Sequence, residues 1–414
     1  MNVLWITNIL LSPVTEYLNL KSNVMRGWMF SSLNSMKNID STINFSVATF
    51  YSGNAFLEKV IDNVTYYCLP LTELDNSSKY WKYINNQCNP DVVHIHGTEY
   101  PYGLKYIECC GTKNVVVSIQ GLVSIYQRYL LGGISEKDIR SNISVRERIL
   151  CQNPVKNIAN SLDNKRVKNE IKYISSVQHV IGRTTWDKNH ALYINPKIEY
   201  HFCNETLRSA FYSRKWKLEE CKKFTIYVSQ GTRPLKGLHN MIKALRSVLN
   251  FYPKTKLMVA GPNILFPKWY RKSTYANYIY KLIEDNDLKK QIIFTGPLAA
   301  PEVVKKLLSS NLYVNPSAIE NSPNSLGEAQ ILGVPCISSN VGGVSDMVKD
   351  NYSGMLYRYE EYEILSLLIC KLFKENDLAQ KISRNGIDTA EQRHDRIANA
   401  KKTISIYKQI VEEH

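Results

Sequence analysis

Short apolar runs alternate with longer mixed segments along most of this 414-residue chain, and this alternation constrains the fold more than any other feature. A short apolar run bounded by turn residues is typical of a buried strand, and each mixed segment is long enough for a crossover helix. Repeated strand and helix units of this kind predict an α/β fold built on parallel sheets. We predict strands at Val3–Thr7, Phe45–Thr49, Val64–Leu69, Val92–His96, Val115–Ile119, Val177–Gly182, Ile198–His201, Thr225–Val228, Lys256–Ala260, Ile292–Thr295, Leu312–Val314 and Pro335–Ser338.

The length of the chain exceeds the usual size of one hydrophobic core, so we expect at least two domains. The rhythm of strands and helices breaks over Cys203–Lys223, where charged and aromatic side chains are dense. We interpret this segment as a linker and predict domains at residues 1–203 and 204–390. Within the first domain, Leu122–Tyr173 is the least regular segment, and such excursions between strands commonly bind a variable substrate.

The composition is that of an ordinary globular protein. Hydrophobic residues make up 44% of the chain and charged residues 21%. No apolar run reaches the roughly 18 residues that a membrane-spanning helix needs. The first apolar run, Val3–Ile6, lacks a basic region and a cleavage site, so we expect a strand rather than a signal peptide. Nine cysteines without a C-x-x-C pair favour reduced thiols and a cytoplasmic location.

The formal net charge is +15, which suits an anionic partner such as nucleic acid, an anionic membrane or a phosphorylated substrate. The basic residues are spread along the chain, and no arginine-rich tract or nucleic-acid-binding motif accompanies them. A site for a nucleotide diphosphate, with attraction to an anionic bilayer, explains the charge more simply than DNA or RNA. We therefore expect no nucleic-acid partner.

Two carboxylates, Glu320 and Glu328, stand in the stretch Asn315–Gly343 between two apolar runs. The stretch predicts a strand, a loop, a short helix and a second strand. A helix that starts near Ser325 places Glu328 in its first turn, where free N–H groups and the macrodipole favour a carboxylate. Glu320 then lies in the loop at the carboxyl end of the strand, where open α/β sheets bind ligands.

Between the two glutamates, Pro323-Asn324-Ser325 offers backbone N–H groups at a helix start, which is a natural seat for an anion. The stretch therefore presents two acceptors for sugar hydroxyls beside a place for phosphate. The alternative is a solvated helix face together with an unrelated loop charge.

A second candidate element follows the strand Thr225–Val228. The loop Ser229–Gly237 contains Gly231, Arg233, Lys236 and Gly237, and it leads into a helix. A glycine-containing loop after the first strand of a Rossmann-like unit is where pyrophosphate binds. Arginine offers a planar fork and lysine a point charge, and both suit phosphate oxygens. Because the loop lacks G-x-G-x-x-G, a basic loop without a ligand is the alternative.

The first half offers four further candidates. Gly27 stands at a predicted helix start, where a glycine permits close approach of the backbone to substrate; a packing glycine is the alternative. Gln120 follows a strand and can position a substrate, although it cannot take up a proton at neutral pH. Arg183 follows the strand Val177–Gly182 and can meet phosphate, with an exposed arginine as the alternative. His94 and His96 end another strand, and we expect their rings on opposite faces, unable to share a metal; a buried, satisfied histidine is the default for each.

Residues 225–357 closely resemble the donor-binding half of family-4 glycosyltransferases. These are retaining enzymes of the GT-B fold, with two facing Rossmann-like domains and a cleft between them. Their E-x7-E motif corresponds to Glu320 and Glu328, followed here by Gly333-Val334-Pro335 and by Gly342-Gly343. The first half resembles the family mainly in strand order and in His96-Gly97.

The resemblance implies roles for single residues. Glu320 meets hydroxyls of the donor sugar and acts as a catalytic group with Arg233 and Lys236, while Glu328 holds the ribose. The expected donor-binding residues are Gly231, Gly237, Asn324, Ser325, Leu326 and Glu328, and the expected acceptor side of the cleft contains Gly27, His96, Gln120 and Arg183. The resemblance also implies that the last helix, about residues 391–414, packs back on the first domain. Neither a divalent metal nor another cofactor is expected, because cationic side chains serve the leaving group and no D-x-D motif is present.

The implied function is a retaining, hexosyltransferase-type enzyme (EC 2.4) that moves a sugar from a nucleotide diphosphate sugar to a glycan or lipid-linked glycan. Relatives of this type build bacterial O-antigen, lipopolysaccharide, capsule or exopolysaccharide at the inner face of the cytoplasmic membrane, so peripheral membrane contact is expected. One alternative is another enzyme on the same fold, such as a nucleotide-sugar epimerase or a disaccharide synthase. The other is a degenerate transferase that binds nucleotide and serves as a scaffold in a polysaccharide-assembly complex.

Overall fold

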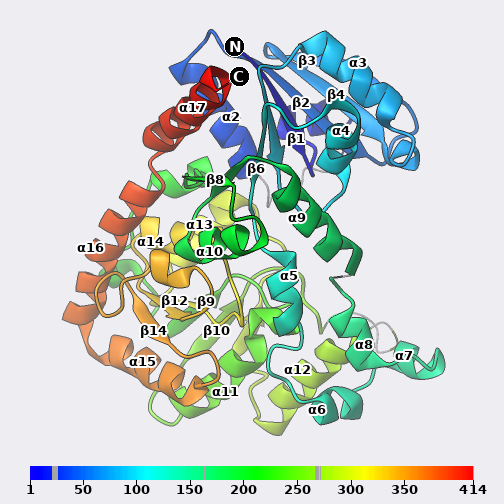
Figure 1. The fold of residues 1–414 in the computed structure, drawn as a ribbon. Coiled ribbons are helices and arrows are strands. Elements are labelled where there is room, and N and C mark those ends of the chain that lie inside the picture. The colour runs from blue at the N-terminus through cyan, green and yellow to red at the C-terminus, as the bar shows by residue number, and fades with distance from the viewer. Residues whose placement is uncertain (21–26, 163, 266–269, 271, 414) are drawn as a thin grey trace. The chain divides into compact units, whose positions relative to one another are not determined.

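The computed structural model describes residues 1–20, 27–162, 164–265, 270 and 272–413. The chain divides into two compact units, drawn in Figure 1. The first contains Met1–Ser124, Asp163–Arg208 and His394–His414, and the second contains Ile125–Leu162 and Ser209–Arg393. Each unit has a largely parallel sheet with helices around it, which confirms the predicted α/β fold with two Rossmann-like domains.

An eight-stranded sheet forms the centre of the first unit, in the order β3-β4-β2-β1-β5-β6-β7-β8. Neighbouring strands are parallel, except that β3 pairs with β4 in the antiparallel sense. All seven strands predicted here are present. The edge strand β3 was missed, because its side chains are mostly exposed and include Glu58 and Lys59. The strands are β1 (Asn2–Thr7), β2 (Asn44–Tyr51), β3 (Leu57–Ile61), β4 (Val64–Pro70), β5 (Val92–His96), β6 (Val115–Ser118), β7 (His179–Gly182) and β8 (Glu199–Phe202).

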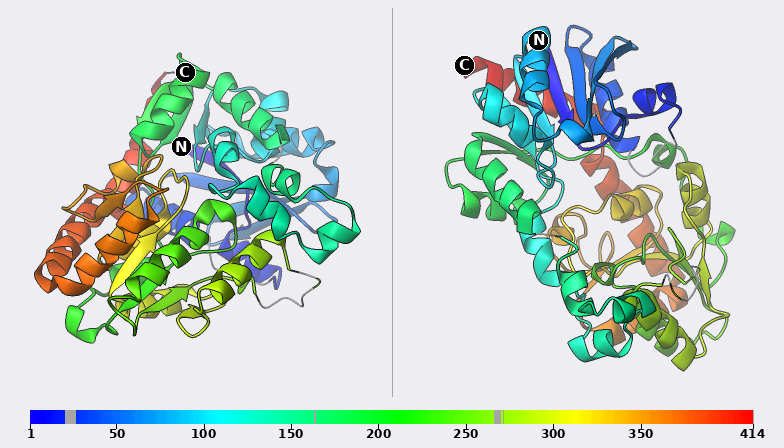
Figure 2. Two further views of the ribbon diagram at one scale, coloured as in Figure 1. Left: turned by 90° about the horizontal axis from the view of Figure 1, so that it is seen from below. Right: turned by 90° about the vertical axis from the view of Figure 1, so that its right-hand side faces the viewer.

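Helices from both ends of the chain cover this sheet. The last helix, α17, packs against α2. The hydroxyl of Tyr407 on α17 accepts a hydrogen bond of 3.0 Å from Trp5 Nε1 and lies 2.6 Å from His94 Nδ1. Because Trp5 lies on β1, the first strand and the last helix share one core. Figure 1 draws α17 beside α2, and Figure 2 shows the same fold from two further sides. The helices are α1 (Ser12–Tyr17), α2 (Gly27–Ile39), α3 (Ser78–Cys88), α4 (Tyr102–Cys110), α9 (Asn164–Ser176), α10 (Thr185–Ile194) and α17 (Arg396–Glu412); α5 (Val123–Tyr126) crosses the boundary between the units.

A six-stranded parallel sheet forms the centre of the second unit, in the order β11-β10-β9-β12-β13-β14. The five strands predicted for this part are present. The short strand β14 was missed, because it contains only three residues. The strands are β9 (Thr225–Val228), β10 (Lys256–Val259), β11 (Ile292–Phe294), β12 (Leu312–Asn315), β13 (Cys336–Ser339) and β14 (Met355–Tyr357).

Residues 125–162 belong to the second unit, whereas one domain was predicted over residues 1–203. Ile134, Ile139 and Val155 are buried in the core of the second unit, and Ser144 N donates to Thr274 Oγ1 at 2.9 Å. Residues 125–162 thus extend the hydrophobic core of the second unit. The helices of the unit are α6 (Glu136–Ser141), α7 (Val145–Ile149), α8 (Pro154–Ala159), α11 (Leu238–Val248), α12 (Thr274–Asp285), α13 (Ala300–Leu308), α14 (Asn324–Ile331), α15 (Tyr362–Lys374) and α16 (Asn376–Arg393).

No helix within the described ranges is both long enough and apolar enough to cross a bilayer.

Candidate active site

The loop after β9 approaches the loop after β12 so closely that one glycine is required. Gly237 has a φ of +66°, and a Cβ there would lie 1.7 Å from the carbonyl oxygen of Pro316. Any other residue would therefore be strained and would clash with backbone. Gly231 is confined in a different way, because its Cβ would lie 2.6 Å from the side chain of Leu238. The two glycines thus fix the path of this loop.

A hydrogen-bonded ion pair joins the two loops. Lys236 Nζ donates to Glu320 Oε1 at 2.5 Å. The side chain of Glu320 is buried, at 9% exposure, while that of Lys236 is 25% exposed. The backbone of Glu320 is fixed as well, because its carbonyl oxygen accepts from Gly343 N at 3.0 Å. The structure therefore brings together a cation and a carboxylate that are far apart in the sequence.

The connection around Glu320 is held by close backbone contacts. A Cβ on Gly342 would lie 2.0 Å from the carbonyl oxygen of Glu320, and Gly342 has a φ of +54°. On the other side, Asn321 N donates to the hydroxyl of Tyr126 at 2.8 Å. The Glu320 carboxylate is thus presented by a backbone with little freedom to shift.

Tyr313 links the loop after β9 to the start of helix α14. Its hydroxyl donates to Ser325 Oγ at 3.0 Å and lies 3.3 Å from Ser229 Oγ. Burial raises the pKa of Tyr313 above its usual range, so the phenol stays protonated and can donate. Tyr313 and Ser229 were not predicted as site residues from the sequence. The sequence does contain one sign of this contact, a tyrosine with a hydroxyl group inside the apolar run Leu312–Val314. The hydrogen-bond partners of that hydroxyl become evident only when the strand pairing is known.

Helix α14 carries the second glutamate of the pair, but not in its first turn. The helix begins at Asn324, with Pro323 as its N-cap, and its first turn contains no acidic residue. The predicted first-turn position of Glu328 is therefore wrong, because Glu328 is the fifth residue of this helix. Glu320 and Glu328 are both buried, at 7% and 5% exposure, so the alternative of a solvated helix face is also wrong. Asn324 and Ser325 are half-buried at the helix start, and Leu326 is buried.

Arg233 lies on the surface of the same loop. It is the N-cap of a 3₁₀ turn, Pro234–Lys236, and its side chain is exposed. Among the described residues, no hydrogen bond or ion pair occupies its guanidinium group. The two cations therefore differ in their contacts. Lys236 forms an ion pair with Glu320, whereas the exposed guanidinium group of Arg233 is available to bind an anion.

In the first unit, His96 lines a small pocket with Trp28, Arg183 and Glu205. The ring of His96 stacks on His94, with centroids 3.8 Å apart. The predicted placement on opposite faces is wrong, because residues two apart in a strand project from the same face.

The two stacked histidines differ in their hydrogen bonds. Nδ1 of His94 contacts the Tyr407 hydroxyl, and Nε2 lies 2.5 Å from Ser118 Oγ, so this ring is satisfied as expected. Both ring nitrogens of His96 are buried and lack a hydrogen-bond partner among the described residues. Burial lowers the pKa of His96 to about 3, so the ring is neutral near pH 7.

Arg183 is buried rather than exposed, so the predicted alternative of an exposed arginine is wrong. Its guanidinium forms an ion pair of 2.6 Å with Glu205 and donates to the carbonyl oxygen of Gln120 at 2.6 Å. The side-chain Nε2 of Gln120 is buried without a hydrogen-bond partner in the described part of the chain. Gly27 starts α2, and a Cβ there would make an ordinary contact of 3.9 Å with Arg208, so the described residues leave space for a side chain at this position.

The candidate residues thus form two groups, one in each unit. Arg233, Lys236, Glu320, Glu328 and the start of α14 lie in the second unit, and His96, Gln120, Arg183 and Gly27 lie in the first. The group in the second unit combines cations, carboxylates and a helix start, which suits an anionic ligand with hydroxyl groups. The group in the first unit offers the neutral imidazole of His96, in a pocket that Arg183 and Glu205 also line, and the buried amide of Gln120.

The two Rossmann-like units define the GT-B fold, and comparison with solved structures supports this. The fold is similar to that of sucrose-phosphate synthase from Thermosynechococcus elongatus, with a TM-score of 0.73. That likeness covers 100% of both chains at 12% sequence identity, so it concerns the fold alone.

Sequence comparison points to the same class of protein. Residues 209–389 match the family model described as "Glycosyl transferases group 1". The chain is 24% identical over 203 residues to the "Putative glycosyltransferase YtcC" of Bacillus subtilis, a match that covers 48% of each chain. It is 32% identical over 84 residues to the "UDP-Gal:alpha-D-GlcNAc-diphosphoundecaprenol alpha-1,3-galactosyltransferase" of Escherichia coli, covering 20% of this chain and 21% of that protein. The chain therefore matches about half or less of the length of these relatives. Together, the fold and the matched domain support a glycosyltransferase of the GT-B fold.

Proposed function

We propose that the chain is a retaining, hexosyltransferase-type glycosyltransferase (EC 2.4) that moves a sugar from a nucleotide diphosphate sugar to an acceptor hydroxyl. The observation that carries this proposal is the Lys236–Glu320 pair of 2.5 Å. It joins the loops that follow β9 and β12, which are adjacent parallel strands. Ligands of open α/β sheets bind at the carboxyl ends of such strands.

Each residue of this group has a role in the proposal. Arg233, Lys236 and the N–H groups at the start of α14 bind the diphosphate and stabilise the charge that develops on it. Glu320 accepts hydrogen bonds from hydroxyls of the donor sugar, and Glu328 from those of the ribose. The E-x7-E resemblance supports these two assignments, and the burial of both carboxylates favours a binding role over a solvated one.

The transfer breaks the bond between the anomeric carbon and the diphosphate oxygen and forms a bond from that carbon to the acceptor oxygen. The acceptor attacks from the face that the diphosphate leaves, and its proton passes to a phosphate oxygen, so the configuration is retained. Cationic side chains serve the leaving group, so the proposed reaction requires no divalent metal. Glu320 orients the sugar in this scheme and does not become a covalent nucleophile of the kind used by retaining glycosidases.

The acceptor is proposed to be a glycan or lipid-linked glycan in the synthesis of bacterial O-antigen, lipopolysaccharide, capsule or exopolysaccharide. The name of the Escherichia coli relative includes a diphosphoundecaprenol acceptor, which supports this choice. His96 and Gln120 offer polar groups for such an acceptor in the first unit. The net charge of +15 fits a cytoplasmic protein that contacts the anionic inner face of the membrane.

A thermal-shift screen with UDP, GDP and ADP sugars, followed by transfer assays, tests the proposal. A nucleotide present at 100 times its Kd should add about 2.7 kcal/mol to the free energy of unfolding. For a donor that binds, NMR of the product should show the anomeric configuration of the donor. Glu320→Gln should keep the fold and lower kcat, and no glycosyl adduct should form on Glu320.

Three results would contradict the proposal. An inverted product would exclude retention, and conversion of a nucleotide sugar to its epimer without acceptor would favour the epimerase alternative. If none of the nucleotides raises the melting temperature, the scaffold alternative is favoured, because the site would then lack a donor.

A further inference from the structure

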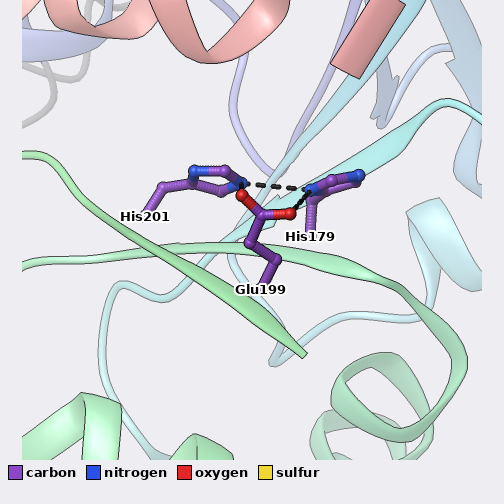
Figure 3. A group of neighbouring side chains, drawn as sticks. All are labelled: His179, Glu199 and His201. Atoms are coloured by element: carbon purple, nitrogen blue, oxygen red, sulfur yellow. Dashed lines mark hydrogen bonds and ion pairs between the residues drawn. The ribbon is translucent and has the colours of Figure 1, made fainter. Parts of the chain in front are cut away.

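A cluster of two histidines and one glutamate lies away from the proposed active site, in the first unit (Figure 3). His179 is the first residue of β7, and Glu199 and His201 lie on the neighbouring strand β8. The strand register places His179 opposite Glu199, and His201 projects from the same face of β8 as Glu199 because the two are two residues apart. The pairing of β7 with β8 therefore brings together His179, Glu199 and His201, which the distance between them in the sequence would not predict.

The donor atoms of the three side chains converge. His179 Nδ1 lies 3.1 Å from His201 Nε2, and the Glu199 carboxylate oxygens lie 3.8 Å from the first nitrogen and 4.0 Å from the second. In tetrahedral coordination with Zn–N bonds of about 2.0–2.1 Å, two nitrogen ligands are about 3.3 Å apart. The imidazoles are therefore already spaced as a pair of zinc ligands. The Glu199 side chain is 39% exposed, so it has room to move the short way that coordination requires.

The surroundings of His179 also match a metal site. Its second ring nitrogen, Nε2, lies 3.3 Å from Glu413 Oε2. A metal-binding histidine usually directs its other ring nitrogen to a carboxylate, which fixes the ring and its tautomer. Gln409 on α17 donates to both Glu199 and Glu413, so these two carboxylates are themselves oriented.

The charges around the cluster and its exposure to solvent favour the binding of a cation. His179 and His201 are buried, at 1% and 7% exposure, while Glu199 opens the cluster to solvent. Lys402 is a positive neighbour of His201, and the carboxylates of Glu199 and Glu413 together outweigh its charge. Imidazole nitrogens suit Zn²⁺, and Zn²⁺ also accepts a carboxylate oxygen, so two histidines and one glutamate form a plausible ligand set with a fourth position for water.

We propose that His179, Glu199 and His201 bind one Zn²⁺ ion, with Glu413 as the carboxylate that holds His179 in place. The site lies at the amino end of β7, whereas Arg183 follows the carboxyl end of the same strand. It is therefore distinct from the proposed active site. The ion would join β7 to β8, and the contact of His179 with Glu413 would link it to the end of helix α17. This proposal does not depend on the proposed function.

Metal binding by the 414-residue chain, without a histidine tag, tests the proposal. After treatment with a chelator and dialysis, Zn²⁺ titration against a chromophoric competitor should give one ion per chain and raise the melting temperature. His201→Gln and Glu199→Gln should each weaken binding at least about 10-fold, and Glu413→Gln by about 10-fold as expected for a supporting carboxylate. His190→Gln is the matched control, because it removes a histidine of the same unit outside the cluster, and Zn²⁺ affinity should not change.

The competing explanation is a plain hydrogen bond between the two imidazoles. It is favoured if the chain binds no stoichiometric Zn²⁺, or if His201→Gln binds as much as the unchanged chain, and either result overturns the proposal. If circular dichroism shows that His201→Gln does not fold, Glu199→Gln decides, because its side chain is partly exposed. Unchanged Zn²⁺ affinity in that variant would refute the site, and a 10-fold loss would support it.

Discussion

At the scale of single residues, Lys236 is the cation whose surroundings are best defined. Its side chain donates to Glu320 while remaining 25% exposed, so it can reach a phosphate from its present position. Hydrogen bonds to charged groups contribute about 1.5–3 kcal/mol, which corresponds to about 10- to 100-fold in affinity. Lys236→Ala should therefore weaken binding of the nucleotide diphosphate sugar by about that factor, measured by isothermal titration calorimetry.

The control for this substitution is Lys254→Ala. Lys254 lies in the same unit with an exposed side chain, so its removal changes the net charge equally without touching the two loops. Equal losses in the two variants would mean that only the overall charge matters. A loss confined to Lys236→Ala would support a direct phosphate contact.

The lowered pKa of His96 leads to a specific prediction of how the stability of the chain depends on pH. Its pKa is about 3 in the folded state and near 6.5 when unfolded, so between these values the unfolded state binds the additional proton. The free energy of unfolding therefore falls as the pH drops below about 6.5, with a slope of up to about 1.4 kcal/mol per pH unit from this one group. His96→Gln removes that contribution, so its stability should fall less steeply with acid.

Urea denaturation between pH 4.5 and 7.5 measures the difference between the two proteins. His239, a buried histidine of the second unit, also has a lowered pKa, but it is present in both proteins and its contribution cancels. His190→Gln serves as a control because it alters a half-buried histidine on α10. Parallel stability curves for His96→Gln and the unchanged chain would contradict the prediction.

At the scale of elements, the turn after β9 depends on Gly237. Alanine at this position meets two penalties, an unfavourable φ of +66° and a Cβ 1.7 Å from the Pro316 carbonyl oxygen. A positive φ alone costs about 1 kcal/mol for a residue with a side chain. Gly237→Ala should therefore lower the free energy of unfolding by clearly more than that, about 3 kcal/mol or more, as measured by urea denaturation.

Gly296→Ala separates the two penalties. Gly296 lies in the same unit with a φ of +75°, but no atom of the described residues lies within 4 Å of the position of a Cβ there. We expect it to lose only about 1 kcal/mol. If the two variants lose the same amount, the close approach of the two loops does not constrain this turn.

The elements also show what the sequence can predict. Buried strands such as Thr225–Val228 are mostly apolar and β-branched or aromatic, so their positions follow from composition. The exposed strand β3 pairs through its backbone and keeps charged side chains, so no apolar run marks it. The start of α14 was placed one residue late, because Pro323 caps the helix without a side-chain hydrogen bond that a sequence pattern could reveal.

The sequence could predict which residues belong to the candidate site, but not which of their side chains contact one another. Glu320 and Lys236 were recognised from their loops, yet their ion pair depends on β9 and β12 being neighbours in the sheet. The burial of Arg183 against Glu205 likewise depends on how the chain returns after β8. His179 and His201 escaped notice for the same reason, since only strand register brings them together.

At the scale of the whole molecule, the first unit contains both ends of the chain. Helix α17 buries several apolar side chains in the same core as β1, and Ile410 among them is fully buried. The first unit is therefore incomplete until the last helix has been synthesised. The second unit needs no part of α17, because its core is formed by residues between 125 and 393.

Ile410→Ala should consequently destabilise the first unit while leaving the proposed donor site intact. Truncating a buried isoleucine to alanine typically costs 2–5 kcal/mol, from lost burial and the remaining cavity. Val411→Ala, the next residue of the same helix with 39% exposure, should cost less than about 0.5 kcal/mol. Calorimetric unfolding should show the loss of stability only for Ile410→Ala. The affinity of this variant for a donor nucleotide should equal that of the unchanged chain, because the residues proposed to bind the nucleotide all lie in the second unit. A loss of nucleotide affinity in folded Ile410→Ala would show instead that the first unit contributes to the donor site.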